Sequence, residues 1–463
     1  MTSTHLTATE ATRLFENGEL SPVELLTDIV ARVKQVEPVI NAVTEEMIES
    51  AYTAARESEC RFREGTARAL EGIPLMLKDE QPIRGMLQQE GSLLLEGEIA
   101  EESHPIVERI EAAGAVMHAR TTTPEFCATT VTHSKLWGVT RNPHNPEFTP
   151  GGSSGGSGAA LAAGSTLLAT GSDIGGSIRI PASYCGVVGF KPPFGRVPGM
   201  APFNSDTYCA DGSMARTVAD VAALQNVISG QWAGDQASLR ERVNLDATVT
   251  SLAGMRIALC PTLGNYRVDP VVLQHTLAVG DALRAVGAEV ELVELPWTVE
   301  QVLETMKPHF AAIMGSALAD LVQGNPQKLE MLMPYSRALI RHNDSAMSYT
   351  EGLEAEARFY RPLGETLERF DALVSPTVAN TGLAADDSCD DPDEIFSIMM
   401  TMPFNIVGRV PVLAVPSGRA PNGVPTGVQI VGRTYDDQAV FRIGAALEAE
   451  LDLWTSSAWW PAL

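Results

Sequence analysis

One segment of this 463-residue chain, residues 150–180, restricts its possible folds more than any other part. A glycine- and serine-rich cluster lies at each end of the segment, at 151–158 and 175–177, and small residues fill most of the stretch between them. Glycine tolerates positive φ and the close approach of other groups, and serine hydroxyls both donate and accept hydrogen bonds. The segment also contains apolar side chains that a flexible Gly/Ser linker would lack, namely Leu161, Leu167, Leu168, Ile174, Ile178 and Ile180. We therefore expect two loops that meet at one place, beside a tightly packed helix.

The rest of the chain predicts an α/β protein. An apolar run after a turn predicts a strand at 73–77, and the pattern continues with a helix at 103–113 and a strand at 115–119. The same order recurs within 255–295, so the chain contains two βαβ-like units, which are typical of layered α/β folds. Further strands are expected at 165–170, 371–378, 410–417 and 427–432, and helices at 7–60, 156–164, 214–228, 298–370 and 437–451.

Charge and cysteine content argue against several classes of protein. With 58 acidic and 33 basic residues the formal net charge is −25, which disfavours binding to nucleic acids or to anionic membranes. The six cysteines lie singly, without a C-x-x-C pair, and the acidic stretch 384–394 lacks EF-hand spacing, so we expect no metal and no cofactor. The first twenty residues do not resemble a signal peptide, and no apolar run is long enough to span a membrane. We expect a cytoplasmic protein with free thiols.

Ser177 is the candidate nucleophile that the residues themselves suggest. Gly175 and Gly176 have no side chains, so consecutive backbone N–H groups can point into a cavity and form a nest for an oxyanion. A serine also needs a base, and none of the eight histidines lies in a motif that resembles a triad member. A buried lysine is the other known base, provided that burial lowers its pKa until it is neutral. Lys78 ends the apolar run at 73–77 in a chain with only six lysines, which makes it the best candidate.

Two matches to the G-x-S-x-G nucleophile elbow, at 151–155 and 152–156, are misleading. An elbow serine directly follows a strand, whereas residues 142–150 contain three prolines. This argues against an α/β-hydrolase. The same objection applies to a phosphate-binding loop, and G-x-x-x-x-G-K-[ST] does not occur.

Three segments resemble the motifs of the amidase signature family: 72–79 (Gly-Ile-Pro-Leu-Met-Leu-Lys-Asp), 150–158 and 173–180. Shorter matches lie at 123–126, 189–192, 214–220, 415–418 and 427–432. The resemblance spans nearly the whole chain, and it is densest at 72–220 and thin at 230–400. It implies the amidase signature fold, an α/β fold with a central mixed β-sheet covered by helices on both faces, in a single domain at 1–463. The chain departs from the family's patterns at Gly212-Ser213 and at Pro193, and neither position belongs to the family's triad.

The resemblance also implies a Ser–cisSer–Lys triad. Ser177 would be the nucleophile, Ser153 on a cis peptide bond would relay the proton, and Lys78, neutral in the resting enzyme, would take it. Ser154 is the second choice for the relay. The implied oxyanion hole consists of the backbone N–H groups of Ile174, Gly175, Gly176 and Ser177. The resemblance further implies that Asp173 and Arg179 form an ion pair that shapes this loop.

The activity that the resemblance implies is hydrolysis of a carbon–nitrogen acyl bond through an acyl-enzyme, in an amide, aryl amide, hydrazide or carbamate. We expect a small-molecule amide-type substrate as the partner, no nucleic acid and no membrane, and we leave a homodimer open. The substrate pocket is expected to come from residues 298–400, with contributions from Phe126, Trp137, Phe203 and Tyr208. Three alternatives stay open: the glutaminase subunit of a tRNA-dependent amidotransferase, an esterase or urethanase of the same family, and a non-catalytic binding protein on this fold.

Overall fold

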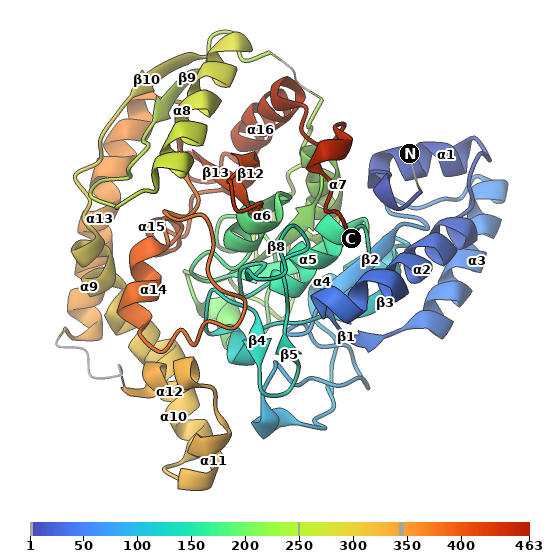
Figure 1. Cartoon of the computed structure of the whole chain (residues 1–463), viewed down its shortest axis with the longest axis horizontal. Helices are drawn as coiled ribbons and strands as arrows, with labels where there is room; N and C mark the ends of the chain where they lie inside the picture. The colour runs from blue at the N-terminus through green and yellow to red at the C-terminus, as the bar shows by residue number, and fades with distance from the viewer. Residues whose placement is uncertain (1–2, 249–250, 342–346) are drawn as a thin grey trace.

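A computed structural model describes residues 3–248, 251–341 and 347–463, and a mixed sheet of 11 strands lies at its centre (Figure 1). In the order in which they lie side by side, the strands are β1 (Val43–Glu46), β3 (Val116–Thr121), β2 (Pro74–Lys78), β6 (Leu168–Asp173), β8 (Ala210–Ala215), β7 (Val188–Lys191), β12 (Val412–Arg419), β13 (Pro425–Gly432), β11 (Ala372–Pro376), β9 (Arg256–Leu259) and β10 (Glu289–Leu292). A separate small hairpin consists of β4 (His133–Ser134) and β5 (Gly138–Val139).

Both predicted βαβ units are present. Strands β2 and β3 pair in parallel and are connected through α4 (Pro105–Ala112), and β9 and β10 pair in parallel and are connected through α8 (Pro270–Ala285). Strand β6 pairs in parallel with β2 but antiparallel with β8, and β12 pairs antiparallel with β13. The sheet is therefore mixed, as predicted.

Helices cover both faces of the sheet because alternate side chains of each strand point to opposite faces. In β2, Leu75 and Leu77 belong to a core shared with α4, α7 (Val218–Ile228), α8 and α16 (Asp437–Leu451). Met76 lies between them and packs on the other face with α2 (Pro22–Ile40) and α5 (Gly155–Ala163). Strand β11 shows the same alternation. Leu373 packs in a second core with α9 (Val299–Phe310) and α13 (Tyr349–Arg369), whereas its neighbours in β11 pack in the first core. The predicted fold class is confirmed.

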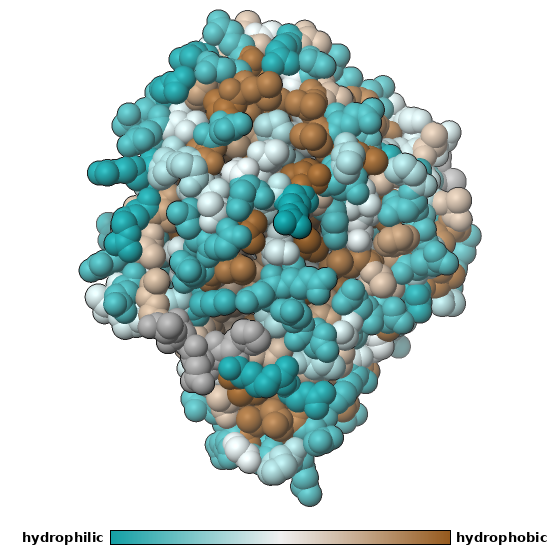
Figure 2. Space-filling model, turned by 60° about the vertical axis from the view of Figure 1, so that its left-hand side comes forward, coloured by the Kyte–Doolittle hydropathy of each residue, from teal (hydrophilic) through white to brown (hydrophobic). Residues whose placement is uncertain are grey.

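The remaining helices are α1 (Ala8–Glu16), α3 (Ile48–Glu64), α6 (Arg179–Cys185), α10 (Ser316–Val322), α11 (Pro326–Met331), α12 (Pro334–Arg341), α14 (Pro392–Ile398) and α15 (Pro403–Ile406). A π-helical turn, Ala311–Gly315, joins α9 to α10. Helices α10, α11 and α12 project from the body at the lower end of Figure 1, and Figure 2 shows polar and apolar side chains together on this projection. No helix within the described ranges is both long enough and apolar enough to cross a membrane.

Helix α5 lies over the centre of the sheet and, apart from Leu161, consists of small residues, all of them buried. A Cβ on Gly155 would lie 2.2 Å from the hydroxyl oxygen of Thr132, and a Cβ on Gly156 would lie 2.5 Å from the backbone nitrogen of Thr122. Side chains larger than hydrogen would therefore push these neighbouring segments away. This close packing explains the small-residue run and agrees with the tightly packed helix that the sequence predicts.

The structure differs from the sequence prediction at three places. Residues 43–46, within the helical region expected at 7–60, form β1 and pair with β3, and residues 210–215, which overlap the helix expected at 214–228, form β8. In both cases pairing with a neighbouring strand outweighs the local helical pattern. Strand β6 begins at residue 168 rather than 165, because the N–H of Ser165 still closes the end of α5 by donating to the carbonyl of Ala160. Residues 342–346, within the helical region expected at 298–370, lie outside the described residues.

Candidate active site

Four polar side chains meet where strand β2 ends. Lys78, the last residue of β2, is fully buried, and its Nζ lies 2.8 Å from the Oγ of Ser153 and 2.7 Å from the Oγ of Ser172. The Oε2 of Glu80 lies 2.8 Å from the same nitrogen. Ser172 belongs to the neighbouring strand β6, and its hydroxyl donates to Glu80 Oε2 over 2.5 Å. The structure thus brings together Lys78 and Ser153, two of the three predicted triad residues.

The loop before α5 places Ser153 next to this lysine. The peptide bond between Gly152 and Ser153 is cis, as the family resemblance implies. A Cβ on Gly152 would lie 2.6 Å from the carbonyl oxygen of Val131, so only glycine fits there. The N–H of Ser154 donates to the carbonyl of Ser177 over 3.1 Å, which ties this loop to the one that carries the candidate nucleophile. Since the hydroxyl of Ser154 donates to the carbonyl of residue 172 instead, Ser153 rather than Ser154 is hydrogen-bonded to the lysine.

A buried ion pair fixes the loop between β6 and α6, which carries Ser177. Each carboxylate oxygen of Asp173 lies 2.9 Å from a guanidinium nitrogen of Arg179, and neither side chain is exposed. Asn405 donates to Asp173 over 2.8 Å, and Arg179 donates to Gln429 in β13 over 2.8 Å. Burial alone would raise the pKa of Asp173, but Arg179 and Asn405 hold it below its ordinary value. The expected ion pair is confirmed, and its hydrogen bonds connect the loop to the sheet.

The four backbone N–H groups expected in the oxyanion hole lie in this loop. Those of Ile174, Gly175, Gly176 and Ser177 donate no hydrogen bond to any residue that the structure describes. Gly176 has a φ of +132°, and a Cβ there would lie 2.1 Å from the hydroxyl oxygen of Thr401. That hydroxyl donates to the carbonyl of Gly175 over 2.6 Å and so holds the peptide in place. The loop therefore offers a preorganised row of donors for an anionic oxygen.

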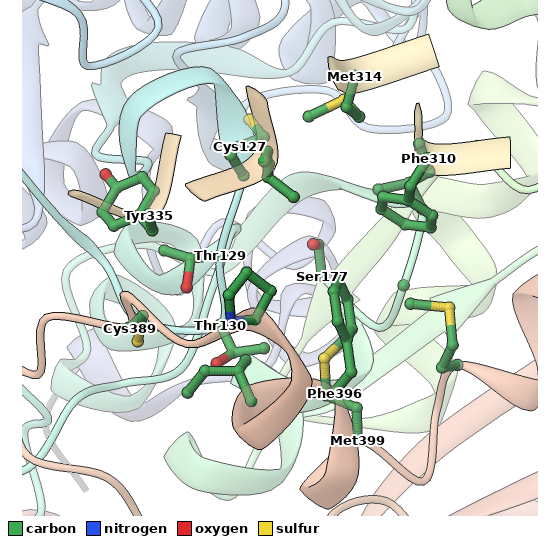
Figure 3. A pocket seen from close by; sticks show the side chains of 17 residues that line it. Cys127, Thr129, Thr130, Ser177, Phe310, Met314, Tyr335, Cys389, Phe396 and Met399 are labelled. Atoms are coloured by element: carbon green, nitrogen blue, oxygen red, sulfur yellow. The ribbon is translucent and has the colours of Figure 1, made fainter. Parts of the chain in front are cut away.

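A narrow cavity of about 40 Å³ lies at Ser177. Figure 3 shows the Ser177 hydroxyl among the side chains that line this cavity. Apolar side chains form most of the wall, among them Phe310, Met314, Leu339, Ile395, Phe396 and Met399. These six residues lie within 298–400, the region expected to form the substrate pocket. None of the described residues that line the cavity carries a charged side chain.

A second cavity, of about 480 Å³, lies beyond Glu80 and has a very different lining. Seven carboxyl side chains border it, namely Glu80, Glu90, Glu98, Glu101, Glu102, Asp211 and Asp235. The side chain of Glu80 is 20% exposed, whereas that of Lys78 is not exposed at all. Glu80 therefore stands between the buried lysine and the second cavity.

Two opposing effects act on the protonation of Lys78. Burial alone would lower the pKa of Lys78, whereas the neighbouring carboxylate of Glu80 acts to raise it. The attraction of Lys78 likewise holds the pKa of Glu80 below its ordinary value, against the effect of burial. Cys127 adds nothing to this near pH 7, because burial and the charge of Glu80 raise the pKa of its thiol to about 12. The prediction of a neutral Lys78 in the resting state considered burial and not this carboxylate, which acts in the opposite direction.

None of the four aromatic residues expected to bind substrate belongs to the wall of the cavity at Ser177. Phe126 is half-buried just outside that wall, and Trp137 lies in the turn between β4 and β5. Phe203 lines the second cavity. Tyr208 is buried in the core, where its ring stacks on that of His309 with the centroids 3.7 Å apart. The sequence marks these residues as aromatic but does not show which face of the chain each one occupies.

Sequence reasoning missed Glu80, Ser172 and Thr401. Glu80 was missed because it lies beyond the strand predicted at 73–77, in a turn that the N–H of Gln81 closes by donating to the carbonyl of Lys78. Ser172 was missed because the strand predicted at 165–170 ended too early, whereas β6 continues to Asp173. Thr401 comes from a segment far away in the chain and has no local signal.

Comparisons with known proteins agree with this geometry. A family model described as Amidase matches residues 24–441. One subunit of the glutamyl-tRNA(Gln) amidotransferase of Synechococcus sp. (strain WH7803) is 32% identical over 470 residues, which cover 94% of this chain and 95% of that protein. A bacterial aryl acylamidase of the amidase signature enzymes has a similar structure, with a TM-score of 0.88 and 26% identity over 97% of both chains. The structure of a 6-aminohexanoate cyclic dimer hydrolase complexed with substrate gives a TM-score of 0.84 and 28% identity over 98% of both chains.

Proposed function

The chain belongs to the amidase signature family, and we propose that it hydrolyses the carbon–nitrogen acyl bond of a small amide that carries an apolar group. In this proposal Ser177 is the nucleophile, Ser153 the proton relay and Lys78 the base. The proposal extends to aryl amides, hydrazides and carbamates, because each presents a carbonyl carbon bonded to nitrogen.

The proposed reaction proceeds through an acyl-enzyme. Ser177 Oγ bonds to the carbonyl carbon while its proton passes to Ser153, and the proton of Ser153 passes to Lys78. The N–H groups of residues 174–177 donate to the oxygen as it becomes negative. The carbon–nitrogen bond then breaks, the proton returns through Ser153 to the leaving amine, and water releases the acyl group by the same steps. Lys78 can take the proton only when its amine is neutral, because a charged ammonium group has no free lone pair.

The observation that carries this proposal is the apolar lining of the cavity at Ser177. A substrate with a charged group in this cavity would lose its hydration without gaining a charged partner from the described lining residues. Free glutamine brings both an ammonium and a carboxylate group. An apolar amide meets Phe310, Met314, Phe396 and their neighbours without this penalty, and each buried CH₂ contributes about 0.8 kcal/mol.

A second candidate function is the glutaminase subunit of a tRNA-dependent amidotransferase. Its support is the sequence comparison. The named amidotransferase subunit is 32% identical and covers almost the whole chain, whereas the aryl acylamidase and the cyclic dimer hydrolase are 26% and 28% identical. By sequence alone this second function is favoured. The apolar lining of the cavity favours hydrolysis of an apolar amide. An esterase or urethanase activity would use the same Ser177, Ser153 and Lys78.

A comparison of substrates separates the two functions. We would measure aniline release from acetanilide, butyranilide, hexananilide and benzanilide, and ammonia release from L-glutamine. The proposal predicts that kcat/KM rises along the aliphatic series, by up to about fourfold for each buried CH₂, and that glutamine is the poorest substrate.

Two half-buried phenylalanines provide a matched test of the cavity. Phe396 lines the cavity at Ser177 and Phe203 lines the second cavity. Phe396→Ala should flatten the aliphatic series, and Phe203→Ala should leave it unchanged. Glutamine turnover above that of every anilide, or activity that depends on partner subunits, would replace the first function by the second.

A further inference from the structure

In the part of the chain that the structure describes, the oxygens of Glu80, Ser153 and Ser172 lie within hydrogen-bond distance of Lys78 Nζ, and only Ser153 can donate to it. An ionised Glu80 has no proton to give, and the proton of Ser172 already points to Glu80 over 2.5 Å. The hydroxyl of Ser153 can act in either direction. A charged Lys78 donates to all three neighbours, whereas a neutral one donates to Glu80 and Ser172 and turns its lone pair to Ser153. The geometry thus fits both a charged and a neutral Lys78, which differ by one proton on Nζ.

We propose that Glu80 is a positioning residue that extends the triad into a relay, Ser177–Ser153–Lys78–Glu80, and this rests on the function proposed above. In the resting state Lys78 is charged and Glu80 is ionised. As Ser177 attacks, one N–H bond of Lys78 breaks and an O–H bond forms on Glu80, along their 2.8 Å contact. The amine of Lys78 then rotates about its Cε–Nζ bond so that the freed lone pair faces Ser153 and takes its proton, and Ser153 takes the proton of Ser177. When the amine leaves, each proton returns by the same route, so no proton is gained or lost.

Glu80 is suited to this role because three donors converge on one of its oxygens. Lys78 and the hydroxyl of Ser172 lie 2.8 Å and 2.5 Å from Oε2, and the thiol of Cys127 lies 3.4 Å from it. This arrangement keeps Glu80 ionised before the reaction, so that this oxygen has no proton of its own and can take one from Lys78. It also holds the Glu80 oxygen at a fixed place beside the nitrogen that must give up its proton.

The other titratable groups around Glu80 do not replace it. They are the thiols of Cys127 and Cys209, the carboxyl groups of Asp79, Glu90 and Asp211, and the side chains of Arg120 and His104 that lie beside two of these carboxyls. Burial raises the pKa of both thiols, so they are neutral near pH 7. Burial and the charge of Glu80 raise the pKa of Glu90 to about 7. Within the described ranges, Glu80 is the carboxylate in ion-pair contact with Lys78.

The second cavity gives Glu80 a route to solvent. Its side chain borders this cavity of about 480 Å³, whereas the apolar cavity lies at Ser177. A substrate that fills the apolar cavity would therefore leave Glu80 in contact with water. In this way Glu80 can exchange protons with solvent while the acyl group is bound in the other cavity.

The pH dependence of the reactivity of Ser177 tests this inference. We would measure the rate at which an alkyl fluorophosphonate modifies Ser177 between pH 5 and pH 10, in the wild type, Glu80→Gln, Glu80→Asp and Glu98→Gln. The wild-type rate should be flat through the neutral range. In Glu80→Gln it should fall at least tenfold at pH 7 and then rise with pH to a plateau, because Lys78 must first lose its proton to solvent and burial then lowers the pKa at which it does so. Glu80→Asp keeps a carboxylate and should stay flat, and Glu98→Gln, the same change in the same cavity, should match the wild type.

Each other outcome has a defined meaning, with thermal unfolding used to compare only folded variants. A Glu80→Gln rate at pH 7 equal to or above the wild-type rate would overturn the relay, since Glu80 would then be neutral for the reaction or inhibitory. A slower rate with an unchanged pH profile would reduce Glu80 to a structural role and also overturn the inference. No modification of wild-type Ser177 at all would instead remove the proposed function, and the relay with it.

Discussion

The substitution Asp173→Asn tests whether the buried ion pair holds the loop that carries Ser177. It replaces a carboxylate by an amide of nearly the same shape, so it changes charge and hydrogen bonding with little change in volume. Both oxygens of Asp173 accept from Arg179, and Asn405 donates to one of them. The new amide keeps one acceptor but turns an NH₂ group toward neighbouring donors.

The expected loss of stability is large because Arg179 cannot reach water. Neither Asp173 nor Arg179 has any exposed side-chain surface. Removing one partner of a buried ion pair costs about 3–5 kcal/mol, because the other charge stays buried without compensation. We expect this decrease in the free energy of unfolding, measured by urea unfolding with tryptophan fluorescence. We also expect the rate of fluorophosphonate modification of Ser177 to fall at least about 100-fold, the effect of losing one oxyanion donor.

A second buried ion pair provides the control. Arg196 and Asp437 lie 3.0 Å apart and are almost completely buried. Asp437 begins α16 and, among the described residues, makes no hydrogen bond to the loop 174–177. Asp437→Asn should reduce stability by a similar amount and leave the rate of Ser177 modification in the folded protein unchanged. The account would be refuted if Asp173→Asn stayed within about 1 kcal/mol of the wild type, or if both variants slowed the modification equally.

Two further predictions concern single residues. Gly176→Ala brings a Cβ to 2.1 Å from Thr401 and should abolish measurable amide hydrolysis. Gly97 also has a positive φ but has free space around it, so Gly97→Ala should retain the activity, and equal activity in both variants would contradict the packing argument. Burial raises the pKa of Glu448 from its ordinary value of 4.5 to about 8. The protonated side chain therefore contributes to stability at low pH, and this contribution is lost as the pH rises from 4.5 through 8. Glu448→Gln keeps an acceptor for the N–H of Val218. This variant should resist urea better than the wild type at pH 8 but not at pH 5, and the absence of a gain at pH 8 would contradict the prediction.

Local patterns predicted the elements that position the site. The glycines and serines of 150–180, the apolar run before Lys78 and the two βαβ-like units all express short-range rules of packing and backbone conformation. Those rules place a strand end, a small-residue helix and a glycine-rich loop in one region, and the structure has this arrangement. Strand β8 was missed because its pairing with β6 and β7 depends on residues far away in the chain.

The charge state and the cavity could not be predicted in the same way. The charge on Lys78 depends on a carboxylate that reaches it from residue 80, and burial was the only effect that the apolar run indicated. The cavity wall combines residues from near 128, 175, 310, 335 and 395, and no local period shows that these segments meet. Tyr208 illustrates the same limit, because an aromatic side chain fills a core as readily as it lines a pocket.

The measurement that tests the central claim most directly is intact-protein mass spectrometry after treatment with an alkyl fluorophosphonate. It would compare the wild type with Ser177→Ala and Lys78→Ala. The account predicts one adduct on the wild type, none on Ser177→Ala and a slower reaction on Lys78→Ala. No adduct on the wild type, or an adduct that persists on Ser177→Ala, would contradict the assignment of the nucleophile and its base.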